Sequence, residues 1–263
     1  TTEIYTLSLH DALPICGFKL FHWKSSEILP PDVIEEAQRR LSAKQFRQEY
    51  EGSFETVTGR IYEDYGQCNY TNEEIESHEL LHWMHDQNFT PLSSAIGVIR
   101  AGKLYLLDEI VLESAISRQS AEEFIERYKN HENKQVYIYG DPAGRAGEKH
   151  GHASDYTEIE DVLKRSGWKF IRKVKPKHPA IKDRQNSVRA MICNTIGERR
   201  LFVNTQKALY CHKGFATVQV KLGSSFLEQE SIYQHITTAV GYMVSYLWPV
   251  NSSQSTIHRV RAN

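Results

Sequence analysis

The sequence lacks several features that would assign it directly to a class of protein. Its four cysteines form no C-x-x-C pair, which argues against a zinc ribbon and is typical of a reducing compartment. No apolar run approaches the ~18–20 residues that a membrane-spanning helix needs, and no signal peptide is evident. We therefore expect a protein that is not secreted and does not bind a membrane.

Two short segments partly match the motifs of a nucleotide-binding loop and of a zinc site, but each departs from the required pattern. Residues 140–149 are glycine-rich, but they depart from the G-x-x-x-x-G-K-[ST] pattern, and His150 stands where Ser or Thr should bind magnesium. His78, His82 and His85 have the spacing of zinc ligands on a helix, but their segment reads as a strand and lacks the glutamate of H-E-x-x-H. We predict neither a nucleotide-binding loop nor a zinc site here, and with no other Walker motif we expect no ATPase.

The first residues do not resemble a natural protein sequence. Residues 7–15, LSLHDALPI, are the translation of CTT TCC CTA CAC GAC GCT CTT CCG ATC, a sequencing adapter, and the chain begins without Met. We therefore treat residues 1–16 as a non-native, disordered scar on a gene truncated upstream. Residues 17–58 then read as a linker and helix, residues 59–250 as one α/β domain, and residues 251–263 as a tail.

The net charge of −1 conceals a strongly basic stretch. Between residues 164 and 184 a single acid, Asp183, stands among nine basic residues. These are Lys164, Arg165, Lys169, Arg172, Lys173, Lys175, Lys177, Lys182 and Arg184. Clusters of Lys and Arg bind phosphate backbones, so this stretch indicates DNA binding, with a solvated basic face as the alternative.

Hydrophobic periodicity predicts an α/β fold. Apolar or alternating segments predict strands at 79–85, 92–100, 104–112, 136–139, 168–174 and 201–203. Helical spacing predicts helices at 33–47, 120–130, 154–166, 182–196 and 228–247. The first three strands form an antiparallel meander, and the nearly all-apolar fourth should be central. The resulting β-β-β-α-β-α-β order is the one that a ribonuclease H-like mixed sheet flanked by helices requires.

Two aspartates follow apolar strands. Asp86 ends the first predicted strand and Asp141 follows the fourth, before a Pro and a Gly. Ligands collect outside the carboxyl ends of strands in open α/β sheets, and carboxylates are the ligands of hard divalent cations. We expect an ionised, exposed Asp86 facing a cation, with turn-capping aspartates as the alternative. On the third strand Asp108 and Glu109 should point to opposite faces, with Glu109 either a supporting metal ligand or part of a salt bridge.

Taken in order, these motifs resemble the nuclease half of the large subunit of tailed-phage terminases. The resemblance covers roughly residues 17–249. Residues 44–54, KQFRQEYEGSF, resemble the segment that joins the terminase motor to its nuclease. The His-Asp-x-Asn context of Asp86 and the order of His235 before an Ala-x-Gly-Tyr segment resemble the nuclease itself. The family packages and cuts viral DNA, and its nuclease has the ribonuclease H-like fold.

The resemblance implies roles for particular residues. Asp86 and Asp141 would bind Mg²⁺ or Mn²⁺, as two ions, and His235 would position water or stabilise the leaving group. Thr238 stands where the family has an acid, which leaves the third ligand undetermined. Glu228 and Glu230, upstream, could replace that acid only if the helix register or the loop allowed it.

The resemblance also implies partners. They would be double-stranded DNA, bound without sequence readout, and, for the full-length protein, the portal and the small terminase subunit, in the cytoplasm of the infected bacterium. Two alternatives remain open. One is a catalytically weakened DNA-binding or motor-docking module of the same fold. The other is a different ribonuclease H-like nuclease, such as a resolvase or transposase.

Overall fold

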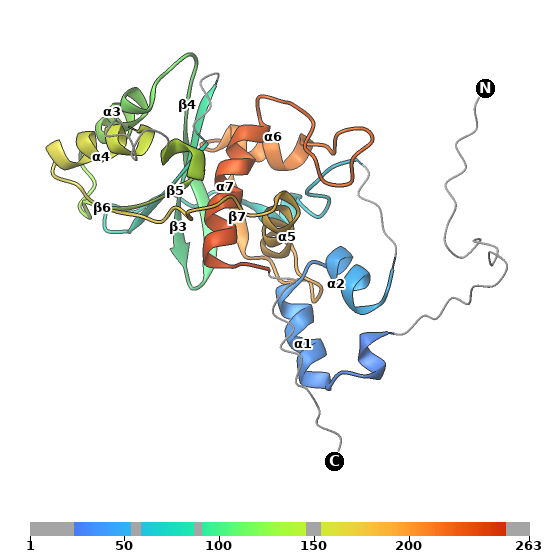
Figure 1. Ribbon diagram of the computed structural model, residues 1–263. Helices are drawn as coiled ribbons and strands as arrows, with labels where there is room; N and C mark the ends of the chain where they lie inside the picture. The colour runs from blue at the N-terminus through green and yellow to red at the C-terminus, as the bar shows by residue number, and fades with distance from the viewer. Residues whose placement is uncertain (1–23, 54–58, 87–90, 146–153, 251–263) are drawn as a thin grey trace.

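A single sheet with helices on both faces forms the centre of the molecule (Figure 1). The computed structural model describes residues 24–53, 59–86, 91–145 and 154–250. The predictions for residues 1–16 and 251–263 therefore lie outside the described residues. Within the described ranges, no helix has the length and apolar character to cross a membrane.

The sheet has seven strands in the order β1-β7-β4-β3-β2-β5-β6. The strands are β1 (Tyr70–Thr71), β2 (Leu81–Asp86), β3 (Leu92–Arg100), β4 (Lys103–Leu112), β5 (Gln135–Gly140), β6 (Lys169–Arg172) and β7 (Leu201–Asn204). β2, β3 and β4 pair antiparallel, whereas β5 pairs parallel with β2, and β6 parallel with β5. This confirms the predicted meander and the mixed α/β class. β5 is an interior strand between β2 and the edge strand β6, and so lies nearer the edge than the predicted central position.

Helices cover the two faces of the sheet unequally (Figure 1). On one face lie α3 (Ser117–Arg127) and α4 (Asp155–Arg165), and on the other lie α5 (Ile181–Ile192), α6 (Leu209–Thr217) and α7 (Gln234–Leu247). Successive strand residues point to opposite faces. Leu81 and Trp83 of β2 therefore belong to the core under α3 and α4, whereas Met84 belongs to the core under α7. By the same alternation Asp86 faces α7.

Two helices before the sheet form a separate small cluster. They are α1 (Pro31–Arg40) and α2 (Ala43–Tyr50), preceded by the short helix η2 (Ser25–Glu27). Ser42 divides the single helix predicted at 33–47, because its hydroxyl caps α2 by accepting from the Gln45 N–H. Leu41 and Phe46 pack against Ala190 of α5, so this unit contacts the sheet domain through α5.

The last helix is shorter than its sequence pattern predicts. It begins at Gln234, and the predicted segment 228–233 is not helical. Glu228 instead pairs with Val220 in an isolated bridge, and Lys221 N–H donates to the Leu227 carbonyl at 2.7 Å. These bonds satisfy the backbone outside a helix. They also move Glu228 from the predicted helix into the loop before α7.

The helix α6 and the strand β1 were not predicted from the sequence. α6 contains Gly214, which weakens a helix by roughly 1 kcal/mol relative to Ala. That glycine serves packing, because a Cβ there would lie 2.5 Å from Thr237 Cγ2 of α7. The short helices η3 (Gln67–Asn69) and η4 (Pro142–Arg145) complete the secondary structure.

The end of β5 depends on a close approach that only glycine allows. A Cβ at Gly140 would lie 2.5 Å from the His85 carbonyl oxygen on β2 and 2.5 Å from the Tyr156 hydroxyl on α4. That hydroxyl donates to the Asp141 carbonyl at 2.9 Å. Gly140 therefore lets β5, β2 and α4 meet at the point where both strands end.

We predict that Gly140→Ala lowers the free energy of unfolding by about 1–3 kcal/mol, the usual cost of adding a methyl to a filled space. Urea denaturation measures the change. Gly66→Ala is the matched control, because a Cβ there meets no atom within 4 Å. Equal stability of the two variants would contradict the close approach at Gly140.

Candidate active site

Two carboxylates lie side by side at one edge of the sheet. Asp86 is the last residue of β2, and Asp141 directly follows β5. The parallel register pairs His85 with Gly140, so the two aspartates each follow a paired residue on neighbouring strands, which lie ~4.8 Å apart. The structure thus brings together the two acids that the sequence singled out.

Asp86 is buried, contrary to the exposed position expected from the sequence. It is only 4% exposed, because α7 covers the end of β2. Burial raises the pKa of the Asp86 carboxyl, and the nearby charge of Asp141 acts in the same direction. His235 opposes both effects: its Nδ1 lies 3.1 Å from Asp86 Oδ2, and this hydrogen bond raises the pKa of His235.

Asp141 both closes a turn and faces the site. Its Oδ1 accepts from the Ala143 N–H at 2.7 Å, as in the turn-capping alternative, and lies 3.4 Å from His178 Nδ1. The charge of Asp141 contributes, after burial, to the raised pKa of Tyr242 on α7. Backbone and side-chain contacts therefore fix the Asp141 carboxylate at the α7 side. The sequence offered no signal for His178, which lies in the irregular segment between β6 and α5.

One face of α7 contacts three different carboxylates. His235, Thr238 and Tyr242 are three and four residues apart and therefore share a helix face. His235 contacts Asp86, the Tyr242 hydroxyl lies 3.3 Å from His178 Nδ1 and close enough to Asp141 for its charge to raise the Tyr242 pKa, and Thr238 Oγ1 donates to Glu228 Oε2 at 3.2 Å. The predicted common face of His235 and Thr238 is confirmed. The loop also brings Glu228 to Thr238, which the sequence left conditional.

Arg184 does not have the exposed position expected of a DNA-binding residue. Its side chain is 9% exposed and forms an ion pair with Glu228 at 3.3 Å. The same Nη2 donates to Thr238 Oγ1 at 3.4 Å, and Gln185 Nε2 donates to Glu228 Oε1 at 3.0 Å. The guanidinium is buried and bound to Glu228 and Thr238. The prediction that Arg184 contacts DNA phosphates is therefore wrong.

Three lysines of the basic stretch belong to the site side of the sheet. Lys173 Nζ lies 3.9 Å from the centre of the Tyr137 ring, and Lys175 Nζ donates to the Ser245 carbonyl of α7 at 2.8 Å. Both line a small hollow beside Gly140, and burial lowers the pKa of Lys175. Lys177 is exposed and immediately precedes His178, the Asp141 contact, and Lys182 is exposed at the start of α5.

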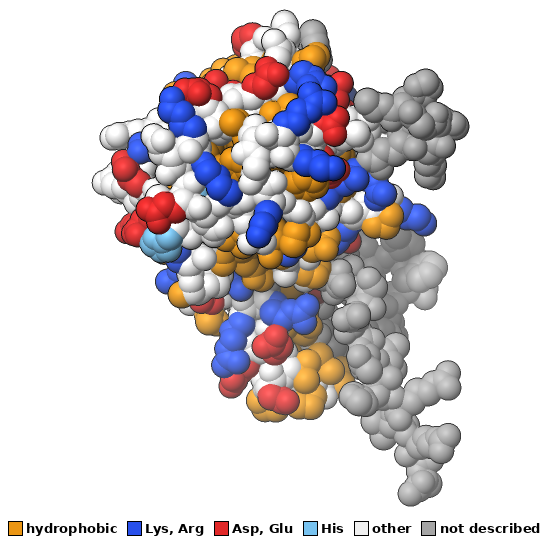
Figure 2. Space-filling view, turned by 90° about the vertical axis from the view of Figure 1, so that its left-hand side faces the viewer, with side chains coloured by type: hydrophobic (Ala, Val, Ile, Leu, Met, Phe, Trp, Pro, Cys, Tyr) orange, Lys and Arg blue, Asp and Glu red, His pale blue; other side chains and the backbone are white. Residues whose placement is uncertain are grey.

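The remaining basic residues point elsewhere. Lys164 and Arg165 end α4, on the opposite face from α7. Arg172 pairs with Glu160 of α4 at 2.9 Å, and Lys169 is exposed at the start of β6. On the side where α3 and α4 lie, Lys and Arg are scattered among acidic and hydrophobic side chains (Figure 2). The predicted continuous basic track is therefore divided between two faces.

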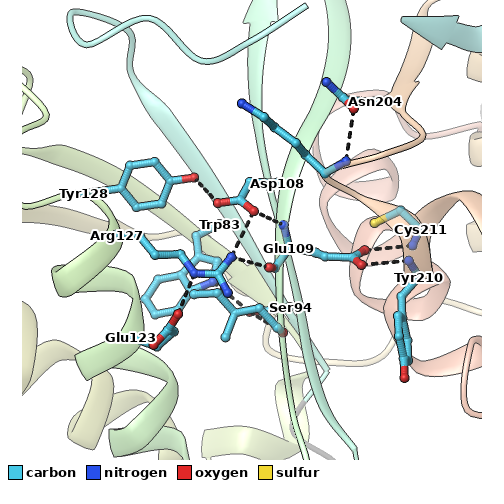
Figure 3. Close-up of polar contacts among 12 residues, drawn as sticks. Trp83, Ser94, Asp108, Glu109, Glu123, Arg127, Tyr128, Asn204, Tyr210 and Cys211 are labelled. Carbon is cyan, nitrogen blue, oxygen red and sulfur yellow. Dashed lines mark hydrogen bonds and ion pairs between the residues drawn. The ribbon is translucent and has the colours of Figure 1, made fainter. Parts of the chain in front are cut away.

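Glu109 has a structural partner instead of a place beside the aspartates (Figure 3). Its two carboxylate oxygens accept from the backbone N–H groups of Tyr210, at 2.7 Å, and Cys211, at 3.0 Å, at the start of α6. This is the favourable position for an acid at a helix N-terminus. The structure therefore corrects the proposal of Glu109 as a metal ligand. Asp108 points the other way, to Arg127 and Tyr128, as predicted.

The residues present fit a hard divalent cation between the two aspartates. Ser93, paired with Asp86 across β2 and β3, is fully buried, and its hydroxyl has no partner among the described residues. Two carboxylates and an unsatisfied hydroxyl are oxygen ligands, as Mg²⁺ and Mn²⁺ prefer. Within the described ranges no group of three or more His, Cys, Asp or Glu could hold a metal. Water would therefore complete the coordination.

Comparison with solved structures identifies the fold. The large terminase of a thermophilic bacteriophage superposes in two crystal forms with TM-scores of 0.60 and 0.61, 16% identity and 84% of this chain covered. The P22 large terminase nuclease domain superposes with a TM-score of 0.50 and 12% identity, over 72% of this chain and 94% of that domain. No family model and no curated protein sequence matches the chain.

This chain spans about half of the large terminase from the thermophilic bacteriophage, 53% and 52% of its length in the two crystal forms. At these identities the likeness concerns the fold. The sheet is the ribonuclease H-like mixed sheet of the terminase nucleases, flanked by helices on both faces.

We predict that Asp86→Asn raises the melting temperature in EDTA at pH 8. Because the pKa of Asp86 is raised in the folded state, the protonated carboxyl stabilises the fold, and this stability is lost as the pH rises through that pKa. At pH 8 the ionised, buried Asp86 beside Asp141 therefore lowers the free energy of unfolding. Removing about 1 kcal/mol would raise the melting temperature by roughly 2–4 °C.

Asp108→Asn is the control for this prediction, because Asp108 accepts from Arg127 and Tyr128 and should lose stability on the same change. Differential scanning calorimetry measures both variants. A melting temperature that falls equally in both would show that Asp86 is an ordinary structural acid.

Proposed function

We propose that this chain is the nuclease part of a terminase large subunit, a metal-dependent endonuclease that cuts double-stranded DNA during phage genome packaging. The observation that carries the proposal is the placement of Asp86 and Asp141 at adjacent strand ends, under the His235 face of α7. The terminase-like fold supports it, although fold alone does not give activity.

Asp86 and Asp141 would hold Mg²⁺ or Mn²⁺ through carboxylate oxygens, with Ser93 close by. The bound cation would neutralise charge on the scissile phosphate and lower the pKa of bound water. The protein's own contribution is to fix the two carboxylates. The Ala143 N–H and the Tyr156 hydroxyl hold Asp141, and His235 holds Asp86.

His235 is the proton-exchanging group of this proposal. Its Nδ1 lies 3.1 Å from Asp86 Oδ2, so the imidazole is a titratable group in direct contact with the carboxylate that would hold the cation. The raised pKa of His235 keeps a larger protonated fraction near neutral pH. Such a group is suited to protonating a leaving group.

DNA would approach from the site side of the sheet. Lys173 and Lys175 line the hollow beside Gly140, and Lys177 precedes His178, which contacts Asp141. These three lysines would contact phosphates without reading bases. Residues 59–250 would form the nuclease domain and residues 17–58 the connection to a motor domain. Under the same proposal, the full-length protein would bind the portal and the small terminase subunit. It would act in the cytoplasm of the infected bacterium.

A weakened, DNA-binding module is the second candidate. It is favoured by Thr238, since the helix that faces the two aspartates presents a hydroxyl there and no acid of its own. Both candidates predict DNA binding, and only the first predicts cutting.

Asp141→Asn should abolish nicking of a supercoiled plasmid in the presence of Mn²⁺. The change removes one of the two charges that hold the cation and keeps an oxygen that can accept from the Ala143 N–H. Agarose gels resolve the nicked product, and circular dichroism checks the fold. Glu109→Gln is the matched control, since Glu109 caps α6 away from the aspartates and should retain nicking. Nicking by Asp141→Asn at the wild-type rate would remove Asp141 from the site.

Replacing Lys173, Lys175 and Lys177 by Ala should weaken duplex binding equally for unrelated sequences. Each lost phosphate contact should reduce the slope of log affinity against log salt by ~0.9. Fluorescence anisotropy with Ca²⁺ present, at several salt concentrations, measures this slope. The double variant Lys164→Ala, Arg165→Ala on the α4 face is the control and should keep the wild-type slope. Equal slopes for the two sets would mean that DNA does not follow the site side.

A further inference from the structure

The α7 face contains a permanent cation of its own. The Arg184 side chain is 9% exposed and that of Glu228 is 4% exposed, and the two form an ion pair at 3.3 Å. Thr238 of α7 contacts both members of the pair. The pair therefore lies on the same helix face as His235 and Tyr242, which contact the two aspartates.

The sequence of α7 makes room for this arginine. A Cβ at Gly241 would lie 2.7 Å from Arg184 Cγ and 2.9 Å from Cδ, so any larger residue would displace the side chain. The guanidinium carbon lies 5.2 Å from the centre of the Tyr242 ring, a favourable cation–π position. Arg184 is thus held by Glu228, by Thr238 and by the ring of Tyr242.

The three carboxylates on this face differ in what neutralises them. Glu228 has a buried guanidinium as its partner and a second donor, Gln185 Nε2. Asp86 and Asp141 are contacted by imidazoles, His235 and His178, which are charged only when protonated. Neither imidazole is a permanent cation, so a divalent cation between the aspartates would add charge neutralisation there, whereas the Glu228 carboxylate already has a guanidinium partner.

We propose that the site takes one divalent cation, between Asp86 and Asp141, and that Arg184 permanently supplies the positive charge at the Glu228 side where a second cation would otherwise bind. This inference rests on the proposed function and specifies its metal content as one ion instead of two. Its consequence is that Glu228 is the counter-ion of Arg184 and not a metal ligand.

Counting bound Mn²⁺ tests this directly. Isothermal titration calorimetry and electron paramagnetic resonance of the wild-type chain should give one Mn²⁺ per chain. Glu228→Gln keeps the contact to Thr238 and leaves Arg184 in place, so it should still bind one Mn²⁺. If Glu228 is instead a ligand of a second ion, the wild type should bind two and Glu228→Gln one, which would overturn the proposal.

Arg184→Met should expose the second position. With its partner gone, the buried Glu228 carboxylate is left uncompensated. The variant should melt at a lower temperature than the wild type in EDTA, should recover more on addition of Mn²⁺ than the wild type does, and should bind two Mn²⁺. Arg184→Met combined with Glu228→Leu is the matched control: it removes both charges, and should bind one Mn²⁺ without the extra thermal recovery.

A folded Arg184→Met chain that binds only one Mn²⁺ would overturn the proposal. If Arg184→Met does not fold, the number of Mn²⁺ ions bound by the wild type and by Glu228→Gln tests the proposal instead. Ion counting is independent of DNA cutting. Failure of the wild type to nick plasmid while binding one Mn²⁺ at Asp86 and Asp141 would therefore reject the nuclease function and leave this inference standing.

Discussion

The enclosure of two neighbouring carboxylates beneath one helix is the constraint on which the rest of the site depends. Asp86 and Asp141 are held close together by strand register, and α7 excludes water from Asp86. Charges buried in this way are costly unless they are paired or bind a cation. The hydrogen bond from His235 and the turn at Ala143 partly offset that cost. The protein thus maintains a locally unfavourable arrangement, as functional sites commonly do.

Much of the fold could be predicted because its signals are local. Apolar runs that end in an acid correctly located β2 and β5, and strand alternation correctly placed Asp108 and Glu109 on opposite faces. The helix expected at 154–166 is present as α4 (Asp155–Arg165), with the Ser154 side chain as its N-cap. These features depend on neighbours within a few residues, which the sequence displays directly.

The misread residues depend on contacts between distant segments. Arg184 looked like part of a basic surface, but its partner Glu228 lies 44 residues away in a loop that the helical pattern concealed. Glu109 looked like a third acid, but the start of α6, 101 residues away, takes both of its oxygens. The sequence shows which side chains carry charge but not which of them are buried. Both predictions were therefore wrong because Arg184 and Glu109 are bound inside the protein by distant segments.

The three contacts along α7 also restrict how such a chain can change. His235, Thr238 and Tyr242 reach carboxylates from three separate segments, and one inserted residue would rotate part of the helix by about 100° and break at least one contact. The turn between Lys221 and Leu227, outside the bridge of Val220 to Glu228, carries no such periodic constraint, and Leu222 within it is fully exposed. Length variation among natural relatives should therefore concentrate in that turn, while α7 keeps a fixed length between its three contact positions.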